Sequence, residues 1–325
     1  MAVFWYNTGV WPISLETSAC RMVLNQDGSI QLQVGETEIG QGADTAFAQM
    51  AAETLSIPVE DVHVMTVQDT DITPFGTGAY ASRQTYMAGF SIRQTAELLK
   101  EKIIETAHDL TRQMKENLDI VNGYIVRTTN GEILMSLGEL ATEKLYSLTD
   151  NGHLTAESSY QIKNNAYSFG CTFAEVEVDI PACRAQVTDI LNVHDCGRLI
   201  NPDLARAQVH GGMSMGIGYA LSEKLLYDEK TGRPLNNNLL DYKLSTFMDH
   251  PDLRVSFIEN YEPTSAYGTK ALGEPPACSP APAIRNAVLA ATGVAVNEIP
   301  LRPHVLFEEF RKAGLIPGEE GKHNV

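Results

Sequence analysis

The stretch Cys20–Leu55, CRMVLNQDGSIQLQVGETEIGQGADTAFAQMAAETL, indicates the class of fold most clearly, because it contains signals for both strands and a helix. Asp27 and Gly28 form the turn of a predicted β-hairpin, and apolar residues alternate with polar ones in the arm that follows. Asp44 then begins a helix whose apolar residues recur at helical spacing. A hairpin followed directly by a helix predicts an α/β protein (α+β, with mixed rather than purely parallel sheets).

The rest of the chain continues this alternation of strands and helices. The expected elements, in chain order, are a strand at 62–65, a loop rich in Pro, Gly and Thr at 73–79, a long helix at 86–115, a hairpin at 124–135, a short helix at 139–146, a strand at 172–178, and helices at 203–226, 280–291 and 303–313. Turn residues at 150–152 mark a boundary, so we expect two lobes, 1–152 and 153–325. A polar, loose tail is expected after Pro317.

Composition and charge exclude several classes of protein. The 325 residues carry a formal net charge of -17, and an acidic chain is repelled by phosphate backbones, so no nucleic acid partner is expected. The five cysteines are scattered and form no CxxC pair, so a reducing cytosol fits better than disulfides or a zinc site. The start lacks a signal peptide, and no apolar run approaches the roughly 20 residues that span a bilayer. We therefore expect a soluble, cytoplasmic protein with no membrane partner.

Aromatic residues are concentrated at the start of the chain, where ends usually fray. Phe4, Trp5, Tyr6 and Trp11 lie within the first eleven residues. Side chains of this size need a surface to pack against. Two interpretations are open: burial in the core of this chain, or contact with a partner.

Two segments place small residues immediately before a predicted helix. Glu38–Thr45, EIGQGADT, has two glycines around Gln41, which let the backbone approach a ligand, and a helix start that offers free N–H groups to an anion. The same pattern is typical of a plain tight turn. Gly78–Thr85, GAYASRQT, gathers hydroxyls and an amide, which suits a phosphate or the edge of a polycyclic ligand. Its alternative interpretation is a helix start capped by Ser or Thr.

Two later segments carry charged and polar residues. His194–Pro202, HDCGRLINP, suggests a metal site or a triad, but adjacent strand residues point to opposite faces and no HExxH spacing is present. A structured turn before a ligand-binding helix, which contains Gln208, is favoured instead. In Lys270–Pro276, KALGEPP, the carboxylate of Glu274 lies on a rigid backbone between glycine and two prolines. Such a carboxylate is either catalytic or an ordinary surface residue in a proline-rich loop.

Together and in this order, the four segments closely resemble the large subunit of the molybdenum hydroxylases, the xanthine dehydrogenase and aldehyde oxidase family. The resemblance covers nearly the whole chain, from about Asn7 to Leu315. It implies a two-lobed molybdopterin-binding domain. The family's subunit is considerably longer, so this chain corresponds to its carboxy-terminal half, either as a natural split subunit or as a fragment.

The resemblance also implies roles for individual residues. Glu274 falls on the family's catalytic glutamate, a general base, and apolar burial is expected to favour its protonated form. The backbone of Ala81 would lie beside the molybdenum, and Gln208 would hydrogen-bond the pterin. The implied cofactor-binding residues are Gly40, Gln41, Gly42, Ala79, Tyr80, Ala81, Ser82, Arg83, Gln84, Thr85 and Gln208.

The substrate pocket departs from one branch of the family. Val10 and Trp11 stand near the place of a Phe-Thr pair in eukaryotic xanthine oxidoreductases, so Trp11 is expected to supply an aromatic wall for a flat heterocycle. The expected reaction is hydroxylation of a purine such as xanthine or hypoxanthine, or of a related N-heterocycle, with oxygen from water. One alternative keeps the cofactor and changes the substrate to an aldehyde, nicotinate or another aromatic. A non-catalytic, cofactor-carrying scaffold is an alternative of a different class.

The resemblance implies cofactors and partners outside the chain. Bacterial members mostly carry the molybdopterin cytosine dinucleotide, which is the form expected here. Electrons would leave through Fe–S clusters and FAD, and because no four-cysteine cluster pattern is present, these are expected in partner subunits. The expected partners are the amino-terminal half of the molybdenum subunit, an Fe–S subunit and an FAD subunit.

Overall fold

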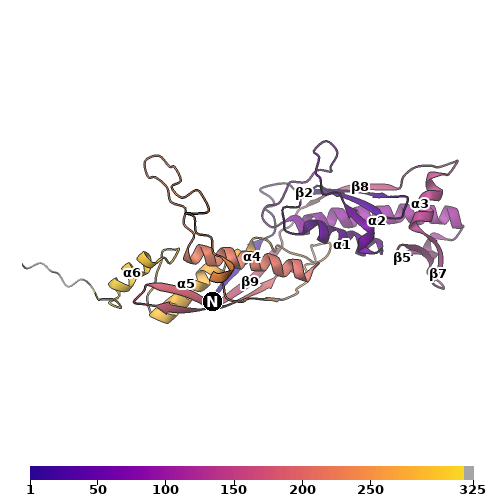
Figure 1. Cartoon of the computed structure of the whole chain (residues 1–325). Helices are drawn as coiled ribbons and strands as arrows, with labels where there is room; N and C mark the ends of the chain where they lie inside the picture. Colours follow the sequence, from indigo (N-terminus) through magenta and orange to yellow (C-terminus); the bar gives the residue numbers. More distant parts are fainter. Residues whose placement is uncertain (318–325) are drawn as a thin grey trace, which may run out of the picture.

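The computed structural model describes residues 1–317 and shows two α/β lobes joined end to end (Figure 1). In the first lobe, a four-stranded sheet has the order β4-β3-β2-β8. Its strands are β2 (Glu16–Leu24), β3 (Ile30–Val34), β4 (Val62–Val64) and β8 (Thr155–Ile162), and its two helices are α1 (Ala43–Leu55) and α2 (Gln84–Thr111). The β2–β3 hairpin is antiparallel and β3–β4 is parallel, which confirms the prediction of mixed sheets.

Helix α2 is the central element of the first lobe. Its predicted apolar face is completely buried against the sheet; these residues are Ile92, Ala96, Leu99, Ile103 and Ala107. The helix ends at Thr111, four residues before its predicted end, because Arg112 adopts a left-handed conformation (φ 57°) and donates its N–H to His108. The sequence therefore predicts the buried face of α2 correctly. The end of the helix depends on the left-handed backbone of Arg112, which the apolar pattern does not indicate.

A small three-stranded sheet closes the far end of the first lobe (Figure 1). It consists of β5 (Leu118–Val121), β6 (Tyr124–Arg127) and β7 (Glu132–Ser136) and is followed by α3 (Leu137–Leu145). Ser136 and Glu139 form a capping box that starts α3. Short 3-10 turns, η1 (Val59–Asp61) and η2 (Lys115–Asn117), precede β4 and β5. The predicted hairpin and short helix are both present.

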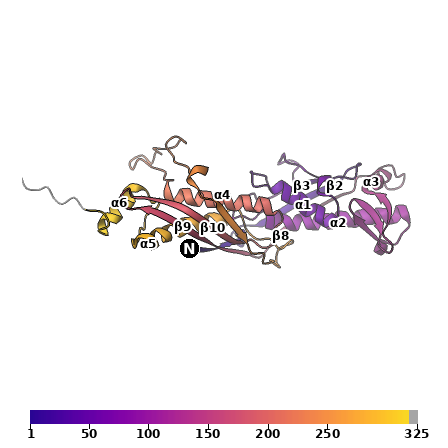
Figure 2. The same ribbon diagram turned by 60° about the horizontal axis from the view of Figure 1, so that its bottom comes forward.

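The second lobe has a curved sheet in the order β1-β9-β10-β11. Its strands are β1 (Ala2–Asn7), β9 (Tyr167–Asp179), β10 (Arg184–Asp195) and β11 (Leu253–Phe257), and its helices are α4 (Pro202–Leu221), α5 (Pro280–Thr292) and α6 (Pro303–Lys312), with 3-10 turns η3 (Phe247–Asp249) and η4 (Pro275–Ala277). Helix α4 lies along the sheet and reaches toward the first lobe (Figure 2). It ends five residues before the predicted 226. The sequence predicted only one strand here, at 172–178.

The two sheets exchange segments across the expected boundary. Strand β1 pairs antiparallel with β9 in the second lobe, and β8 pairs antiparallel with β2 in the first. A division at residue 152 therefore does not separate the sheets. Within residues 1–317, no helix combines the length and the apolar character that crossing a membrane requires. The expected loose tail after Pro317 lies outside the described residues.

The aromatic side chains at the start of the chain point in two directions. Phe4 is buried against Gly170, where an added Cβ would lie 2.5 Å from the phenyl Cζ. Trp5, the next residue on β1, points the other way and is 69% exposed. One face of β1 therefore packs in the core, and the other is open to a partner.

Close packing between α4 and η4 fixes the position of the loop that carries Glu274. A Cβ added at Gly212 would lie 2.6 Å from Pro276 Cβ and 3.0 Å from the Ala277 nitrogen. The neighbouring Gly211 has nothing within 4 Å of the same position. Only glycine at 212 allows the helix and the loop to approach this closely.

We predict that Gly212→Ala lowers the free energy of unfolding by about 1–3 kcal/mol, because overpacking displaces η4. Gly211→Ala is the matched control; it should raise stability by about 0.5–1 kcal/mol through helix propensity. Urea unfolding of the two purified variants measures both values. Equal effects of the two substitutions would contradict the close packing.

Candidate functional site

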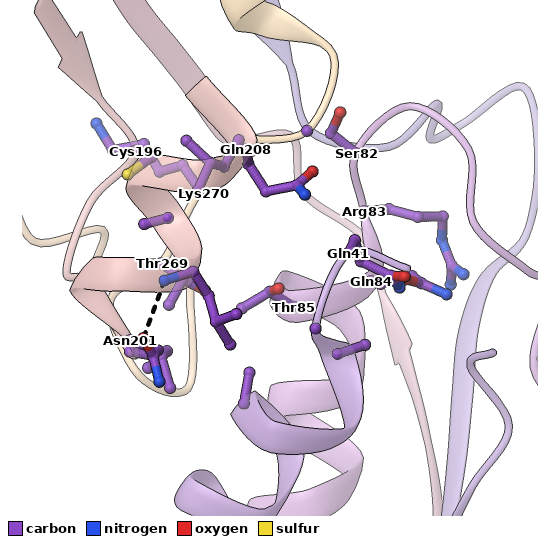
Figure 3. A pocket seen from close by; sticks show the side chains of 18 of the residues that line it. Gln41, Ser82, Arg83, Gln84, Thr85, Cys196, Asn201, Gln208, Thr269 and Lys270 are labelled. Atoms are coloured by element: carbon purple, nitrogen blue, oxygen red, sulfur yellow. Dashed lines mark hydrogen bonds between the residues drawn. The ribbon is translucent and has the colours of Figure 1, made fainter. Parts of the chain in front are cut away.

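A cavity of about 420 Å3 lies between the two lobes, and all four sequence segments contribute to it (Figure 3). Its walls come from the start of α1, the loop before α2, the first turns of α4, and the loop that ends at Glu274. The predicted residues that line it are Gln41, Gly42, Ala79, Tyr80, Ser82, Arg83, Gln84, Thr85, Gln208 and Glu274. Gly40, Ala81, Val10 and Trp11 lie outside this lining. The volume is in the range of small-molecule and cofactor sites.

Three helices begin at the wall of the cavity, but only some of their N–H groups are free. At α1, the Glu38 carboxylate accepts from Gly40 (2.7 Å), Gly42 (3.0 Å) and Asp44 (3.1 Å). The expectation of free donors is therefore only partly met at this helix start, because an internal carboxylate occupies the N–H groups of Gly42 and Asp44. Those three backbone bonds hold the pKa of Glu38 below its usual value, although burial opposes them.

The start of α2 is open in contrast. No side chain caps it, and the N–H groups of Gln84 and Thr85 have no partner among residues 1–317. Free N–H groups and the helix dipole together form a site for an anion. At α4, Asn201 caps the helix by accepting from Leu204 N (3.0 Å) and also donates to Gln49 of α1 (3.2 Å), so it joins the two lobes beside the cavity.

Three glutamine amides face this region. Gln41 and Gln84 are hydrogen-bonded to each other, and both donate to the carbonyl of Thr37 (3.2 Å and 2.9 Å), so they brace the cavity wall. The Gln208 amide has no hydrogen-bond partner within residues 1–317 and extends from α4 into the cavity (Figure 3). An amide offers both donors and an acceptor, which suits the edge of a nitrogen heterocycle.

Arg83 is completely buried between the loop before α2 and the first-lobe sheet. Its Nε donates to Glu16, Nη1 lies 3.3 Å from Glu36 Oε1, and neither carboxylate side chain is exposed. Nη1 also reaches the carbonyl of Gly78 (3.0 Å), and Nη2 reaches that of Thr17 (2.9 Å). Four of the five guanidinium N–H groups are therefore used inside the protein. We expect a ligand to meet Arg83 mainly through its backbone.

The second carboxylate of this network is unusual. Burial raises the pKa of Glu36 to about 7, although Ser18 (2.6 Å) and Arg83 favour its charged form. When Glu36 carries a proton, Arg83 and Glu16 form a neutral ion pair. The buried group of Arg83, Glu16 and Glu36 then has no net charge, and burial of an unpaired negative charge is avoided.

The loop before α2 has a strained backbone. Ala81 (φ 46°) and Ser82 (φ 49°) are consecutive left-handed residues, a conformation that costs about 1 kcal/mol or more at each non-glycine position. The Ala81 carbonyl accepts from Gly9 N (3.0 Å), and Val10 N donates to Glu16 (2.7 Å). The predicted substrate-side loop is therefore joined to the predicted cofactor loop. Trp11 is half-buried and its carbonyl accepts from Asn165 (2.8 Å).

Glu274 lies at the edge of the cavity, and its carboxylate is exposed in this chain. The expected apolar burial is therefore not supplied by residues 1–317. Ser82 donates to Glu274 Oε2 (3.0 Å), and Glu274 N donates back to Ser82 Oγ (2.8 Å). A second donor, Tyr6 OH, lies 2.6 Å from the same Oε2. The sequence did not indicate Tyr6 as a site residue, since 268 positions separate it from Glu274.

The segment 194–196 divides into separate structural roles. His194 is buried beside Phe4, and burial lowers the pKa of its imidazole to about 4. Asp195 forms an ion pair with Lys270 (2.8 Å), and Cys196 lies at the cavity wall. Residues 1–317 contain no group of three or more His, Cys, Asp or Glu side chains placed to bind a metal ion. A strand end and a turn therefore lead into α4, as the sequence favoured.

Arg198 is a further wall residue that the sequence analysis missed. It is exposed, lines the cavity, and forms no ion pair among the described residues. A free guanidinium is notable in a chain with a net charge of -17. Its presence within the HDCGRLINP segment was the only available signal.

Comparison with known proteins decides the family. A family model described as "Molybdopterin cofactor-binding domain" matches residues 1–251. The chain belongs to the molybdopterin cofactor-binding domain family. The membership that the four segments indicated is thereby confirmed.

Named relatives of the family cover nearly the whole chain. The xanthine dehydrogenase molybdenum-binding subunit of Escherichia coli O157:H7 is 52% identical over 97% of this chain and 42% of its own length. The aldehyde oxidoreductase molybdenum-binding subunit PaoC of Escherichia coli K12 is 31% identical over 91% and 39%. The crystal structure of quinoline 2-oxidoreductase from Pseudomonas putida 86 matches with a TM-score of 0.85 at 27% identity, covering 95% and 41%. This chain thus spans less than half the length of each, and the α/β fold is confirmed.

We predict that Arg83→Met lowers the free energy of unfolding of this molybdopterin-binding domain by about 3–5 kcal/mol, because two buried carboxylates lose their cation. Arg206→Met is the control: its ion pair with Asp203 is exposed, so the expected loss is below about 0.5 kcal/mol. Chemical denaturation of both variants provides the comparison. Similar losses would show that the buried network contributes little.

Proposed function

We propose that this chain is the cofactor-binding, carboxy-terminal half of the molybdenum subunit of a multi-subunit hydroxylase, with Glu274 as its general base. The hydrogen bonds between Glu274 and Ser82 are the observation that carries the proposal. They attach an exposed carboxylate to the loop that forms one wall of the cavity. A proton acceptor thereby lies where a reacting group held in the cavity would be presented.

The cavity residues fit a molybdopterin. When bound, this cofactor supplies two-electron oxidation of a substrate carbon with water as the oxygen source. In the proposal, the free N–H groups of Gln84 and Thr85 bind phosphate, Arg198 neutralises phosphate charge, and Gln208 hydrogen-bonds the pterin. The backbone of Ala81 would lie beside the metal. Two separate anion partners, the start of α2 and Arg198, favour a pyrophosphate and hence a dinucleotide form. Of the dinucleotide forms, the cytosine one is proposed because the chain resembles bacterial members of the family.

The remaining predicted residues position these groups. Gln41 and Gln84 brace the wall, and Glu38 fixes the backbone of Gly40 and Gly42. Gly40 has nothing within 4 Å of an added Cβ, so its surface is open to a ligand. Ala79, Tyr80, Ser82 and Arg83 hold the strained loop that presents Ala81.

A purine such as xanthine or hypoxanthine, or a related N-heterocycle, is the proposed substrate. The 52% identity to a xanthine dehydrogenase subunit supports this choice over an aldehyde, because the aldehyde oxidoreductase subunit is 31% identical. Val10 and the aromatic Trp11 lie on the loop that is bonded to Ala81 through Gly9, on the substrate side in the proposal. A flat heterocycle would pack against Trp11. A scaffold without turnover has no need for a carboxylate at position 274.

The proposed partners complete the subunit and carry the electrons away. The chain spans 42% of the xanthine dehydrogenase subunit it matches, so an amino-terminal half is proposed as its first partner. An extended loop, residues 223–252, projects from the second lobe (Figure 1). It exposes large apolar side chains: Leu225, Leu226, Tyr227, Leu235, Leu239, Leu240, Leu244, Phe247 and Met248. Exposed apolar area of this kind is typical of a protein interface. The further proposed partners are an Fe–S subunit and an FAD subunit, which would accept the electrons. The proposed location of the complex is the cytoplasm.

We predict that Glu274→Gln lowers kcat for xanthine or hypoxanthine at least about 100-fold in the purified complex, because an amide cannot take the proton. Glu298→Gln, which removes an exposed carboxylate paired with Lys224, is the control and should leave kcat unchanged. Steady-state turnover of wild type and both variants is measured, with equal cofactor content verified first. Unchanged kcat in Glu274→Gln would remove this residue as the base.

A further inference from the structure

We propose that Tyr6 is a positioning residue for Glu274: its hydroxyl, together with Ser82, holds Oε2 of the carboxylate and leaves Oε1 as the oxygen that takes the proton. The inference rests on the proposed role of Glu274 as the base. It concerns a residue that lies at the opposite end of the chain and outside the four sequence segments.

The backbone places Tyr6 opposite Glu274 with little freedom. Strand β1 pairs with β9, and Tyr6 stands opposite Ser168 in the register. Ser168 of β9 donates to the Ala271 carbonyl (2.5 Å), and Ala271 N donates to Thr8, the residue directly after β1 (2.9 Å), so these contacts also hold the start of the Glu274 loop. Both partners of the Tyr6–Glu274 contact are therefore fixed to one sheet.

The two oxygens of the carboxylate have different surroundings. Oε2 accepts from Tyr6 OH (2.6 Å) and from Ser82 Oγ (3.0 Å). Oε1 has no hydrogen-bond partner within residues 1–317. A carboxylate held by two donors on one oxygen has a fixed plane, and the remaining lone pairs of its other oxygen are directed outward. Proton transfer depends on such geometry because the acceptor must lie within hydrogen-bond reach.

Tyr6 is suited to remain a donor over the working pH range. Burial, followed by the hydrogen bond to Glu274, raises the pKa of its phenol well above the ordinary value. The hydroxyl therefore stays protonated, and able to donate, at neutral pH.

The test compares Tyr6→Phe with wild type in the purified complex, with xanthine as the substrate probe. Loss of one donor frees the plane of the carboxylate, so proton transfer is impaired while substrate binding is kept. We expect kcat to fall about three- to tenfold, as for one lost hydrogen bond of ordinary net strength, and KM to stay unchanged. A purely structural role for Tyr6 would not confine the change to kcat.

Tyr167→Phe is the matched control. Tyr167 lies on the neighbouring strand, contacts Trp5, and forms no hydrogen bond to Glu274. Its kcat and KM should coincide with those of wild type. If Glu274→Gln is inactive and Tyr6→Phe keeps the wild-type kcat and KM, the Tyr6 inference is overturned alone. If Glu274→Gln keeps wild-type turnover, the proposed function fails first.

A second measurement needs no substrate. Melting temperatures are compared for Tyr6→Phe, Glu274→Ala and the double variant. Because the two side chains share one hydrogen bond, the double variant should lose fewer degrees than the sum of the single losses. Additive losses would show that the two residues do not interact and would overturn the inference, whatever the substrate is.

Discussion

The buried ion pairs of Arg83 with Glu16 and Glu36 are the interaction on which the rest of the site depends. Arg83 lies before α2, Glu16 at the start of β2, and Glu36 two residues after β3, and all three side chains are removed from solvent. Burying an unpaired charge costs several kcal/mol, so the network permits few arrangements of the three segments. The buried network holds Arg83 in place, and the two residues before it, Ala81 and Ser82, have a strained, left-handed backbone.

Several parts of the site take their positions from this network. Glu16 also accepts from Val10 N, which places the substrate-side loop. Ser82, one residue before Arg83, holds the carboxylate of Glu274 from the other lobe. The proposed cofactor wall, the proposed substrate-side loop and the proposed base are therefore all linked to one guanidinium. In this arrangement the cavity lies at the lobe junction, where closure by a second half of the subunit would exclude water.

Local patterns were sufficient for much of the fold. The hairpin around Asp27 and the apolar stripe of α2 follow from turn chemistry and helical spacing, which involve only near neighbours. Pairings between distant segments were not predictable in this way. Strand β1 pairs with β9 across the whole first lobe, and no periodicity in residues 2–7 specifies that partner.

The same distinction applies to the site. The four segments were recognisable because their residues are close in sequence, and all four meet at one cavity. Their internal arrangement was not predictable: Arg83 turns into the core, Glu38 accepts from Gly42 and Asp44 at the start of α1, and Tyr6 reaches Glu274. Each of these depends on which face a side chain takes after folding. A sequence motif identifies candidate residues of a site, whereas the orientation of their side chains depends on tertiary contacts.

The most direct test of the central claim is the molybdenum and pterin content of the complex purified from its natural source. Elemental analysis and identification of the released nucleotide are made on the same sample. The account predicts one molybdenum and one molybdopterin cytosine dinucleotide for each copy of this chain. A stoichiometric, correctly folded complex that contains neither molybdenum nor pterin would contradict it.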